Sequence, residues 1–293
     1  MIELLTDVLP DAALDSLKLL PFLFLTYLVM ELLEHKASDK TYSIIYRSGK
    51  LGPLIGATLG AVPQCGFSAM ASNLYAGRII SVGTLIAIFL STSDEMLPVM
   101  ISSGIPVLTM IYILLYKIAV GMIVGFACDL LFFRRRSGAE ELSHICEREH
   151  CHCERGIFVS AVIHTVKIFL FVFIMNFLLG TAIFFIGEDR LSSVIHGAPL
   201  LSHILSSLIG LIPNCAASVI ITSLYTDGLI TAGTMLSGLL TGSGIGLMIL
   251  FKMNRNVKEN LAVCGVLLLF GVLFGILADI TPVGDLITSS LGR

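Results

Sequence analysis

Long apolar stretches separated by short polar ones fill most of the chain. The longest, 157–186, exceeds the roughly 20 residues that a helix needs to cross a membrane's hydrocarbon core. In the first half the pattern predicts helices over 14–33, 51–74, 79–89, 96–105 and 106–133. In the second half it predicts helices over 157–185, 201–224, 229–240, 245–251 and 261–280. We therefore expect an all-α, multi-pass membrane protein with about ten transmembrane helices.

The second half of the chain repeats the first, displaced by 150 residues. The sequence GAVPQC at 60–65 corresponds to GLIPNC at 210–215. The match continues without a gap through further identical pairs: Ser68 and Ser218, Leu74 and Leu224, Tyr75 and Tyr225, Asp129 and Asp279. Two glycines four residues apart, at 121 and 125, recur at 271 and 275. We assign these glycines to close helix packing.

The basic residues predict how the chain lies in the membrane. They cluster at 36–50, 134–136 and 252–258, whereas the N-terminus is acidic. By the positive-inside rule the basic clusters face the cytoplasm and both chain ends lie outside. The first half then crosses an odd number of times, which predicts two inverted five-helix repeats with broken helices. The expected domains are a first repeat at 1–133, a cytoplasmic loop at 134–156 and a second repeat at 157–293.

Composition supports a membrane environment and excludes several functions. The chain is 56% hydrophobic and 13% charged, against about 25% charged residues in soluble domains. It shows no signal-peptide pattern, so we expect a cytoplasmic (inner) membrane protein. No nucleotide fingerprint or catalytic motif appears, and the basic residues sit in short loops, which argues against an enzyme and against nucleic-acid binding.

Two matching Pro-polar-Cys elements are the first candidates for a transport site. Each proline removes a helix hydrogen bond and frees a carbonyl, while the amides, thiols and nearby hydroxyls add ligands. The alternative is an ordinary proline kink with a buried cysteine acting as a small apolar residue. The candidate residues are Pro63, Gln64, Cys65 and Ser68, with Pro213, Asn214, Cys215 and Ser218.

Acidic residues within apolar segments are further candidates. Asp94 and Glu95 lie between two segments too short to cross alone, so they would bind a cation or carry a coupling proton, or else form a cytoplasmic turn. The corresponding residues of the second half, Gly244 and Ile245, carry no acid. Asp129 and Asp279 recur near the ends of their spans, where an interfacial role and a ligand role are both open.

The polar linker contains a dense group of thiols and imidazoles. Short Cys/His-rich tracts commonly bind metal, and their soft ligands favour zinc, copper, cadmium or arsenite. The spacing matches no standard zinc module, so we expect a flexible sensor or delivery loop, with an incidental polar linker as the alternative. The residues are His144, Cys146, His150, Cys151, His152 and Cys153.

The segment VPQCGFS at 62–68, its partner IPNC at 212–215 and the duplicated plan resemble a known family. This family comprises ten-span manganese or heavy-metal exporters related distantly to the arsenic permeases. Relatives among the arsenic permeases carry a Pro-x-Cys-x-Cys-Gly element, of which only Pro63, Cys65 and Gly66 are present here. The missing second cysteine counts against a thiol-based arsenical site. The resemblance implies efflux of a metal or metalloid.

These features together predict a secondary-active transporter that works by alternating access between its two halves. The expected cargo is manganese or another divalent heavy metal. An organoarsenical or organic-anion permease is the alternative, and a membrane-embedded thiol enzyme is a further one. We expect the lipid bilayer and a small ion or molecule as partners, a homo-oligomer as an option, and no tightly bound cofactor beyond a transported or loop-bound metal ion.

Overall fold

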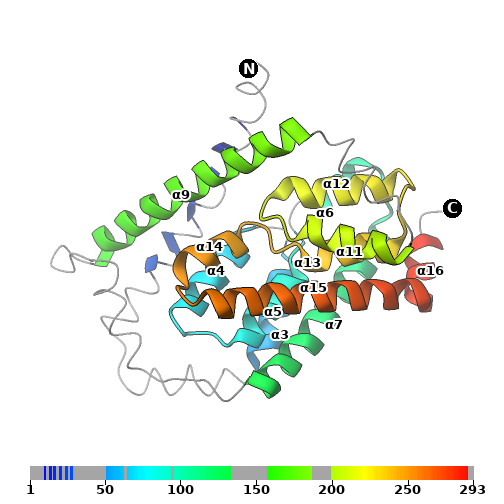
Figure 1. Ribbon diagram of the computed structural model, residues 1–293, viewed down its shortest axis with the longest axis horizontal. Coiled ribbons are helices and arrows are strands. Elements are labelled where there is room, and N and C mark those ends of the chain that lie inside the picture. Colours follow the sequence, from blue (N-terminus) through cyan, green and yellow to red (C-terminus); the bar gives the residue numbers. More distant parts are fainter. Residues whose placement is uncertain are drawn as a thin grey trace.

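The computed structural model describes residues 51–62, 65–93, 96–132, 157–186 and 199–289, together with isolated positions between 10 and 28. All regular elements in these ranges are helices (Figure 1). In the first half they are α3 (Gly52–Gly60), α4 (Cys65–Ala76), α5 (Val82–Ser91), α6 (Met96–Ser102) and α7 (Val107–Phe132). The rest are α9 (Ile157–Ile186), α11 (Pro199–Gly210), α12 (Cys215–Thr226), α13 (Ala232–Thr241), α14 (Gly246–Met253), α15 (Val257–Ile280) and α16 (Pro282–Ser289).

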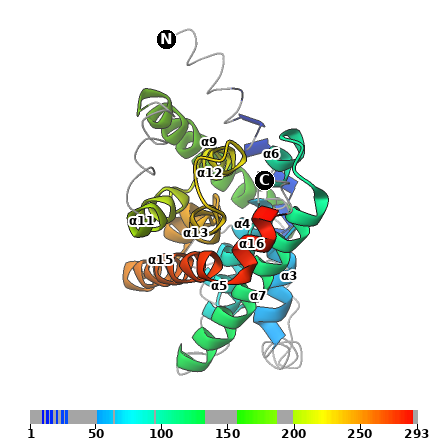
Figure 2. The same ribbon diagram turned by 90° about the vertical axis from the view of Figure 1, so that its right-hand side faces the viewer.

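The sequence repeat is also a repeat of helices. The helices α4, α5, α6 and α7 begin 150 residues before α12, α13, α14 and α15, respectively. Within each half the middle helix packs in the same way: α5 contacts α3 and α7, and α13 contacts α11 and α15. Figure 2 shows α3 and α7 together on one side and α11 and α15 on the other. The expected all-helical architecture is confirmed for the described residues.

Four stretches are long and apolar enough to cross a membrane: Val82–Ser102, Val107–Leu131, Ala232–Met253 and Val257–Ile280. The first contains α5 and α6 and the third contains α13 and α14, so both are broken helices, as the short segments predicted. In an 18-residue apolar window of the α13–α14 stretch 89% is buried inside the protein, whereas in the matching window of α15 only 28% is buried. This distribution follows from chemistry, because a broken backbone inside a membrane needs protein to satisfy its free N–H and C=O groups.

The prediction of one span at 51–74 and one at 201–224 is wrong, because each region contains two helices: α3 and α4 in the first, and α11 and α12 in the second. A Cβ at Gly52 would meet Thr84 at the start of α5, and a Cβ at Gly60 would meet Ser91 at its end, so α3 runs parallel to α5. The next helix, α4, ends only five residues before α5 begins. The pair α3–α4 is therefore a hairpin that enters and returns, and its first arm ends at Gly60. Matching contacts of Gly210 with Gly238 and Thr241 place α11 parallel to α13.

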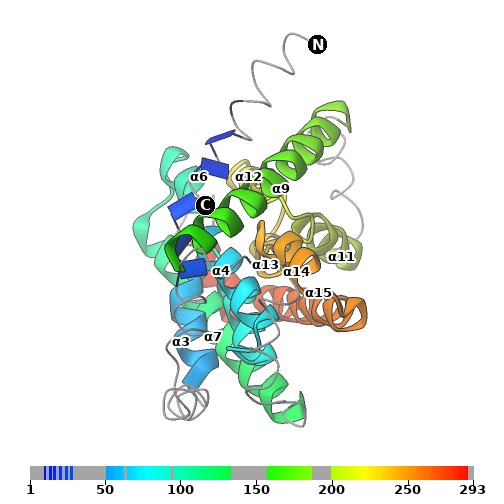
Figure 3. The ribbon, with the colours of Figure 1, turned by 90° about the vertical axis from the view of Figure 1, so that its left-hand side faces the viewer.

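The two halves interlock through these hairpins. The returning arm α4 packs on α14 of the second half, and α12 packs on α6 of the first. Ser72 Oγ of α4 donates to the Gly246 carbonyl of α14 at 2.6 Å. Figure 3 shows α4 beside α14, with α9 at the outside of the bundle. Each half thus contributes one arm to the packing of the other.

Small residues allow this close packing, as expected for the recurring glycines. A Cβ on Gly125 would lie 2.7 Å from the Gly83 carbonyl oxygen, and one on Gly275 would lie 2.7 Å from that of Gly233. Real Cβ atoms do not approach so closely, so α7 and α15 contact α5 and α13 through backbone. The helix α16 has no counterpart among the expected elements, because its eight residues are too few for a span.

Candidate functional site

A small pocket with a mixed polar and apolar lining lies where the broken helices and the second hairpin tip meet. It has about 320 Å³ of empty volume, part of it open to solvent, and accepts about one water-sized sphere between its atoms. A bare ion or a small polar group fits such a space. Both halves contribute to its lining, which includes Thr92 and Ser93 after α5, Asn214 and Ser218 at the start of α12, and Gly242 and Gly244 after α13.

The second Pro-polar-Cys element forms one wall of this pocket. Pro213 stands in the hairpin tip, and Asn214 caps α12 by accepting a hydrogen bond from Ala216 N at 2.9 Å. Ser218 Oγ donates to the Cys215 carbonyl at 2.8 Å. Asn214 and Ser218 line the pocket, and Cys215 is buried next to Asn214. The N-terminal end of α12, where backbone N–H groups are partly positive, therefore borders the pocket.

The first Pro-polar-Cys element is placed only in part. Pro63 and Gln64 lie outside the described residues, and of Cys65 only the backbone, which begins α4, is described. Ser93 Oγ donates to the Ala61 carbonyl at 2.6 Å, so the described edge of this hairpin tip is bonded to a pocket residue. Ser68 is buried in the contact between α4 and α14, and it is not among the pocket-lining residues.

A buried lysine joins the two halves at this pocket. Lys117, in the middle of α7, is 0% exposed. Its ammonium donates to the carbonyls of Thr92, which caps the C-terminal end of α5, and of Leu239 in the last turn of α13, the latter at 2.8 Å. Helix C-terminal ends are partly negative, so the ammonium lies where two such ends meet. A charge at this depth is costly unless it is bound in this way.

The paired aspartates hold the start of each middle helix. Asp129 accepts from Gly83 N at 3.0 Å and from Ser81 Oγ at 2.8 Å. Asp279 accepts from Gly233 N at 2.7 Å and from Thr231 Oγ1 at 2.6 Å. Carboxylates are well suited to the free N–H groups of a helix start. Of the two roles left open, each aspartate has a structural one, as a clamp between two helices.

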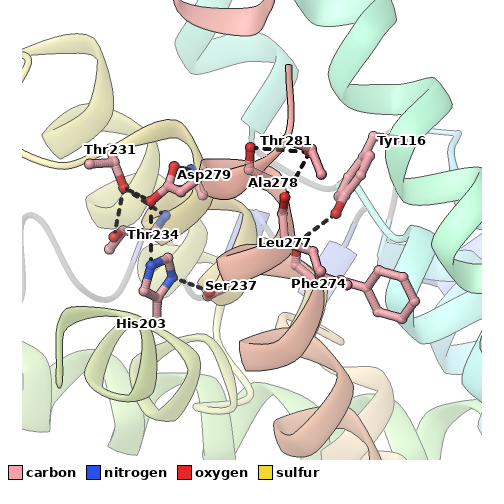
Figure 4. A network of polar contacts seen from close by, with 11 residues as sticks. Tyr116, His203, Thr231, Thr234, Ser237, Phe274, Leu277, Ala278, Asp279 and Thr281 are labelled. Atoms are coloured by element: carbon pink, nitrogen blue, oxygen red, sulfur yellow. Dashed lines mark hydrogen bonds and ion pairs between the residues drawn. The ribbon is translucent and has the colours of Figure 1, made fainter. Parts of the chain in front are cut away.

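The second clamp carries an additional histidine (Figure 4). His203 of α11 lies with Nε2 3.4 Å from Asp279 Oδ2 and with Nδ1 2.8 Å from Ser237 Oγ. His203 is 5% exposed and Ser237 is 0% exposed. The corresponding residues of the first half are Pro53 and Ala87, which have no titratable or hydroxyl group. This histidine cluster, His203, Ser237 and Asp279, therefore belongs to the second half alone.

Several predicted candidates lie outside the described residues. These are Asp94 and Glu95 and the loop residues His144, Cys146, His150, Cys151, His152 and Cys153. Among the described residues, no group of three His, Cys, Asp or Glu side chains is arranged to hold a metal ion. The described pocket is lined by oxygen and amide groups, which are hard ligands, and also by Met96, whose thioether is a soft one.

Sequence reasoning overlooked the most deeply buried charge of the site. Lys117 is the only charged residue between Ile105 and Asp129, and a lone charge at the centre of a span is a sign of a functional site. Thr92 and Ser93, which line the pocket, were not predicted as site residues, although the neighbouring Asp94 was. His203 was not among the candidate site residues, and the structure places it in contact with Ser237 and Asp279.

Broken helices that meet at a pocket between the two halves of a membrane protein are typical of the class of transporters. The chain matches, over residues 2–186, the family described as "Putative, 10TM heavy-metal exporter", which covers more than half of its 293 residues. The chain belongs to this family, and the resemblance expected from the sequence is confirmed. It is a multi-pass membrane protein of a transporter family rather than an enzyme. Neither the curated proteins nor the solved structures gave a match.

Proposed function

We propose that the protein is a secondary-active transporter that exports a metal or metalloid ion by alternating access between two inverted repeats. The observation that carries this proposal is the pocket at the ends of α5 and α13. There the backbone of two broken spans ends inside the protein, and one lysine is bonded to both. We call this meeting of the ends of α5 and α13 the crossing. In a transporter, helix ends at such a place offer carbonyl groups to the cargo and a point about which the two halves can move, and a static scaffold needs neither.

The repeated contacts support an inverted arrangement of the halves. Asp129 lies three residues before the end of α7, close to the basic cluster at 134–136, and Asp279 lies at the corresponding place in α15. The basic residues after α7 and before α15 then lie on one side of the membrane if each long helix crosses once. On this proposal the start of α5 faces the cytoplasm and the start of α13 faces outside.

The ligands of the pocket favour a hard cation such as manganese. Asn214, Ser218, Thr92 and Ser93 offer amide, hydroxyl and carbonyl oxygens, which manganese prefers over thiols. The positive charge of Lys117 is opposed by two helix ends, each equivalent to roughly half a negative charge. We propose that Asp94 and Glu95, which follow Ser93 in the chain, supply the negative charge that a cation needs.

Lys117 also favours a second candidate, an organic-anion or organoarsenical permease. An anion in the pocket would meet the N-terminal end of α12 and the ammonium of Lys117 without any further group. This alternative does not need Asp94 or Glu95. A cation exporter requires their charge, so neutralising them separates the two candidates.

We also propose that the polar linker at 134–156 binds metal, as its sequence predicts. His144, Cys146, His150, Cys151, His152 and Cys153 would bind a softer metal and act as a sensor or delivery loop for the transporter. Deleting residues 146–153 should then change the metal concentration at which export begins, while the maximal rate of export stays unchanged.

The deciding experiment uses the purified full chain in liposomes. Uptake of Mn²⁺, Cd²⁺, arsenite and methylarsonate is measured for the wild type, Asp94→Asn/Glu95→Gln, Cys65→Ser/Cys215→Ser and Asn214→Ala. A cation exporter moves Mn²⁺ or Cd²⁺ and loses this activity in the doubly neutralised variant. An anion permease moves methylarsonate and keeps this activity. If the cysteine variant transports every probe like the wild type, the paired thiols are not ligands.

A further inference from the structure

The histidine cluster combines the features of a proton-binding site. Imidazole is the side chain that changes its charge between about pH 5 and pH 8. His203 is nearly excluded from solvent, and both of its ring nitrogens face a polar partner. A purely structural residue at this place would need no titratable ring.

The first half provides an internal control for what the clamp alone requires. Asp129 binds Gly83 N and Ser81 Oγ without any histidine, and that half has the same fold around α5. The clamp therefore does not need His203. What Asp279 has beyond Asp129 is a partner whose charge depends on pH, and this difference calls for a role outside the clamp.

The hydrogen-bond partners determine where a proton adds. An ionised carboxylate only accepts hydrogen bonds, so Nε2 of His203 carries a hydrogen toward Asp279. In the neutral ring Nδ1 then has a lone pair, which accepts from the Ser237 hydroxyl. A proton that binds Nδ1 reverses this bond, because Nδ1–H now donates to Ser237 Oγ and the Ser237 hydroxyl hydrogen must turn to another acceptor.

The reversal acts on the helix that borders the pocket. Ser237 is followed in α13 by Gly238 and Leu239, which line the pocket, and the Leu239 carbonyl accepts from Lys117. Proton binding at His203 and cargo binding in the pocket therefore both change the contacts of α13. When two ligands act on one element, each changes the affinity of the other by the same factor.

Within the part of the chain that the structure describes, few other charges face this histidine. On the helices packed against α11, α13 carries no acid or base, and α12 carries only Cys215 and Tyr225. Of the charged residues of α15, Asp279 contacts His203, while Lys258 and Glu259 belong to its opposite end. Among the described residues, Asp279 is thus the charged partner of His203.

We propose that His203 is the proton-binding site that couples transport to a proton gradient, with Asp279 and Ser237 as its positioning residues. This inference rests on the proposed export of a cation. The proton enters from the side of the membrane that Asp279 faces, which is the outside in the predicted orientation. The bound proton then repels a cation in the pocket, so the protein releases the metal ion when it binds the proton. The result is exchange of a proton for a metal ion.

The test separates coupling from transport in liposomes that contain the full chain, with Mn²⁺ and Cd²⁺ as probes. Exchange of the metal at equal pH on both sides reports the proposed function. Accumulation driven by a pH difference reports the coupling, and one pH unit supports about tenfold accumulation per coupled proton. We expect His203→Gln to keep exchange and to lose this accumulation, together with the dependence of exchange on pH.

The repeat supplies the matched control. Asp129→Asn and Asp279→Asn damage equivalent clamps, but only Asp279→Asn should weaken accumulation, because only Asp279 faces a histidine. Ser237→Ala, which removes one hydroxyl, should shift the midpoint of the pH profile without abolishing accumulation. If His203→Gln still accumulates metal about tenfold, or if both aspartate variants behave alike, the proposal is wrong.

A second experiment measures proton binding at His203 without any metal, so its result does not depend on the choice of cargo. In histidine-labelled protein, the nuclear magnetic resonance signal that is lost in His203→Gln should move when the pH is changed, because a proton binds the ring. A signal that does not move with pH overturns the proton site whatever the protein transports. If the wild type exchanges no probe while His203 titrates, the proposed cargo is wrong and the proton site stands.

Discussion

Moving the buried lysine from one half of the protein to the other tests the role that the structure gives it. The residue that corresponds to Lys117 in the second half is Leu267, which is also 0% exposed. In the double variant Lys117→Leu/Leu267→Lys the ammonium stays at the crossing of α5 and α13 but comes from α15. The repeat predicts that it would then reach the carbonyls of Gly242 and Phe89, which correspond to those of Thr92 and Leu239.

The cost of the single change Lys117→Leu follows from the groups left behind. Two buried carbonyls lose their donor, and one such group costs about 1–3 kcal/mol. The variant also no longer buries an ammonium, and this relief offsets part of the loss. We expect a net destabilisation of about 2 kcal/mol, near the lower end of the range for two carbonyls.

Thermal unfolding in detergent measures the effect. A loss of about 2 kcal/mol lowers the Tm by about 4–8 °C in a chain of this size, and the double variant should recover at least half of this loss. Leu267→Lys alone should be destabilising, because two ammonium groups then compete for the same helix ends. Lys117→Leu/Val263→Lys is the matched control, since it places a lysine at another buried position of α15 and should recover nothing.

Two results would refute this reasoning. If Lys117→Leu keeps the Tm and the transport activity of the wild type, the ammonium does not hold the crossing. If the double variant is no better than the single one, the helix ends of the two halves are not equivalent, and the repeated contacts do not extend to the centre of the protein.

The remaining predictions use the same thermal measurement in detergent. Gly83→Ala should lower the Tm strongly, since its Cβ would overlap a carbonyl of α7, whereas Gly265→Ala, with no atom within 4 Å of its Cβ, should leave it unchanged or raise it. Asn214→Ala should cost about 1 kcal/mol through the lost cap of α12, and equal stability would show that this cap contributes nothing. Arg78 has φ 58°, so Arg78→Gly should be more stable than Arg78→Ala by about 1 kcal/mol, although both lose the ion pair with Glu259.

The sequence predicted the parts of the fold that depend on local pattern. The ungapped repeat predicted that both halves would have the same helices, and four helices of the second half begin 150 residues after their counterparts in the first. The short apolar segments correctly predicted the breaks between α5 and α6 and between α13 and α14. In each case the information lies within one or two turns of the break.

The hairpins could not be predicted in this way. A proline within an apolar stretch is compatible with a kinked span and with a turn that reverses the chain, because both leave the periodicity on either side unchanged. The direction of α4 is determined by its packing on α14, which is far away in the sequence. Lys117 could have been predicted as a buried charge, but its two carbonyl partners come from α5 and α13 and become visible only in three dimensions.

The residues that differ between the two halves indicate where function departs from scaffold. Corresponding residues in a duplicated fold have the same structural task, so Asp129 and Asp279 need no functional explanation for their clamps. Lys117 against Leu267, and His203 against Pro53, place a titratable group in one half only. Both groups contact α13: Lys117 binds the carbonyl of Leu239 in its last turn, and His203 binds the hydroxyl of Ser237. On the proposal of proton–cation exchange, this asymmetry gives the proton a site of its own in the second half, which is linked to the cargo pocket through one helix.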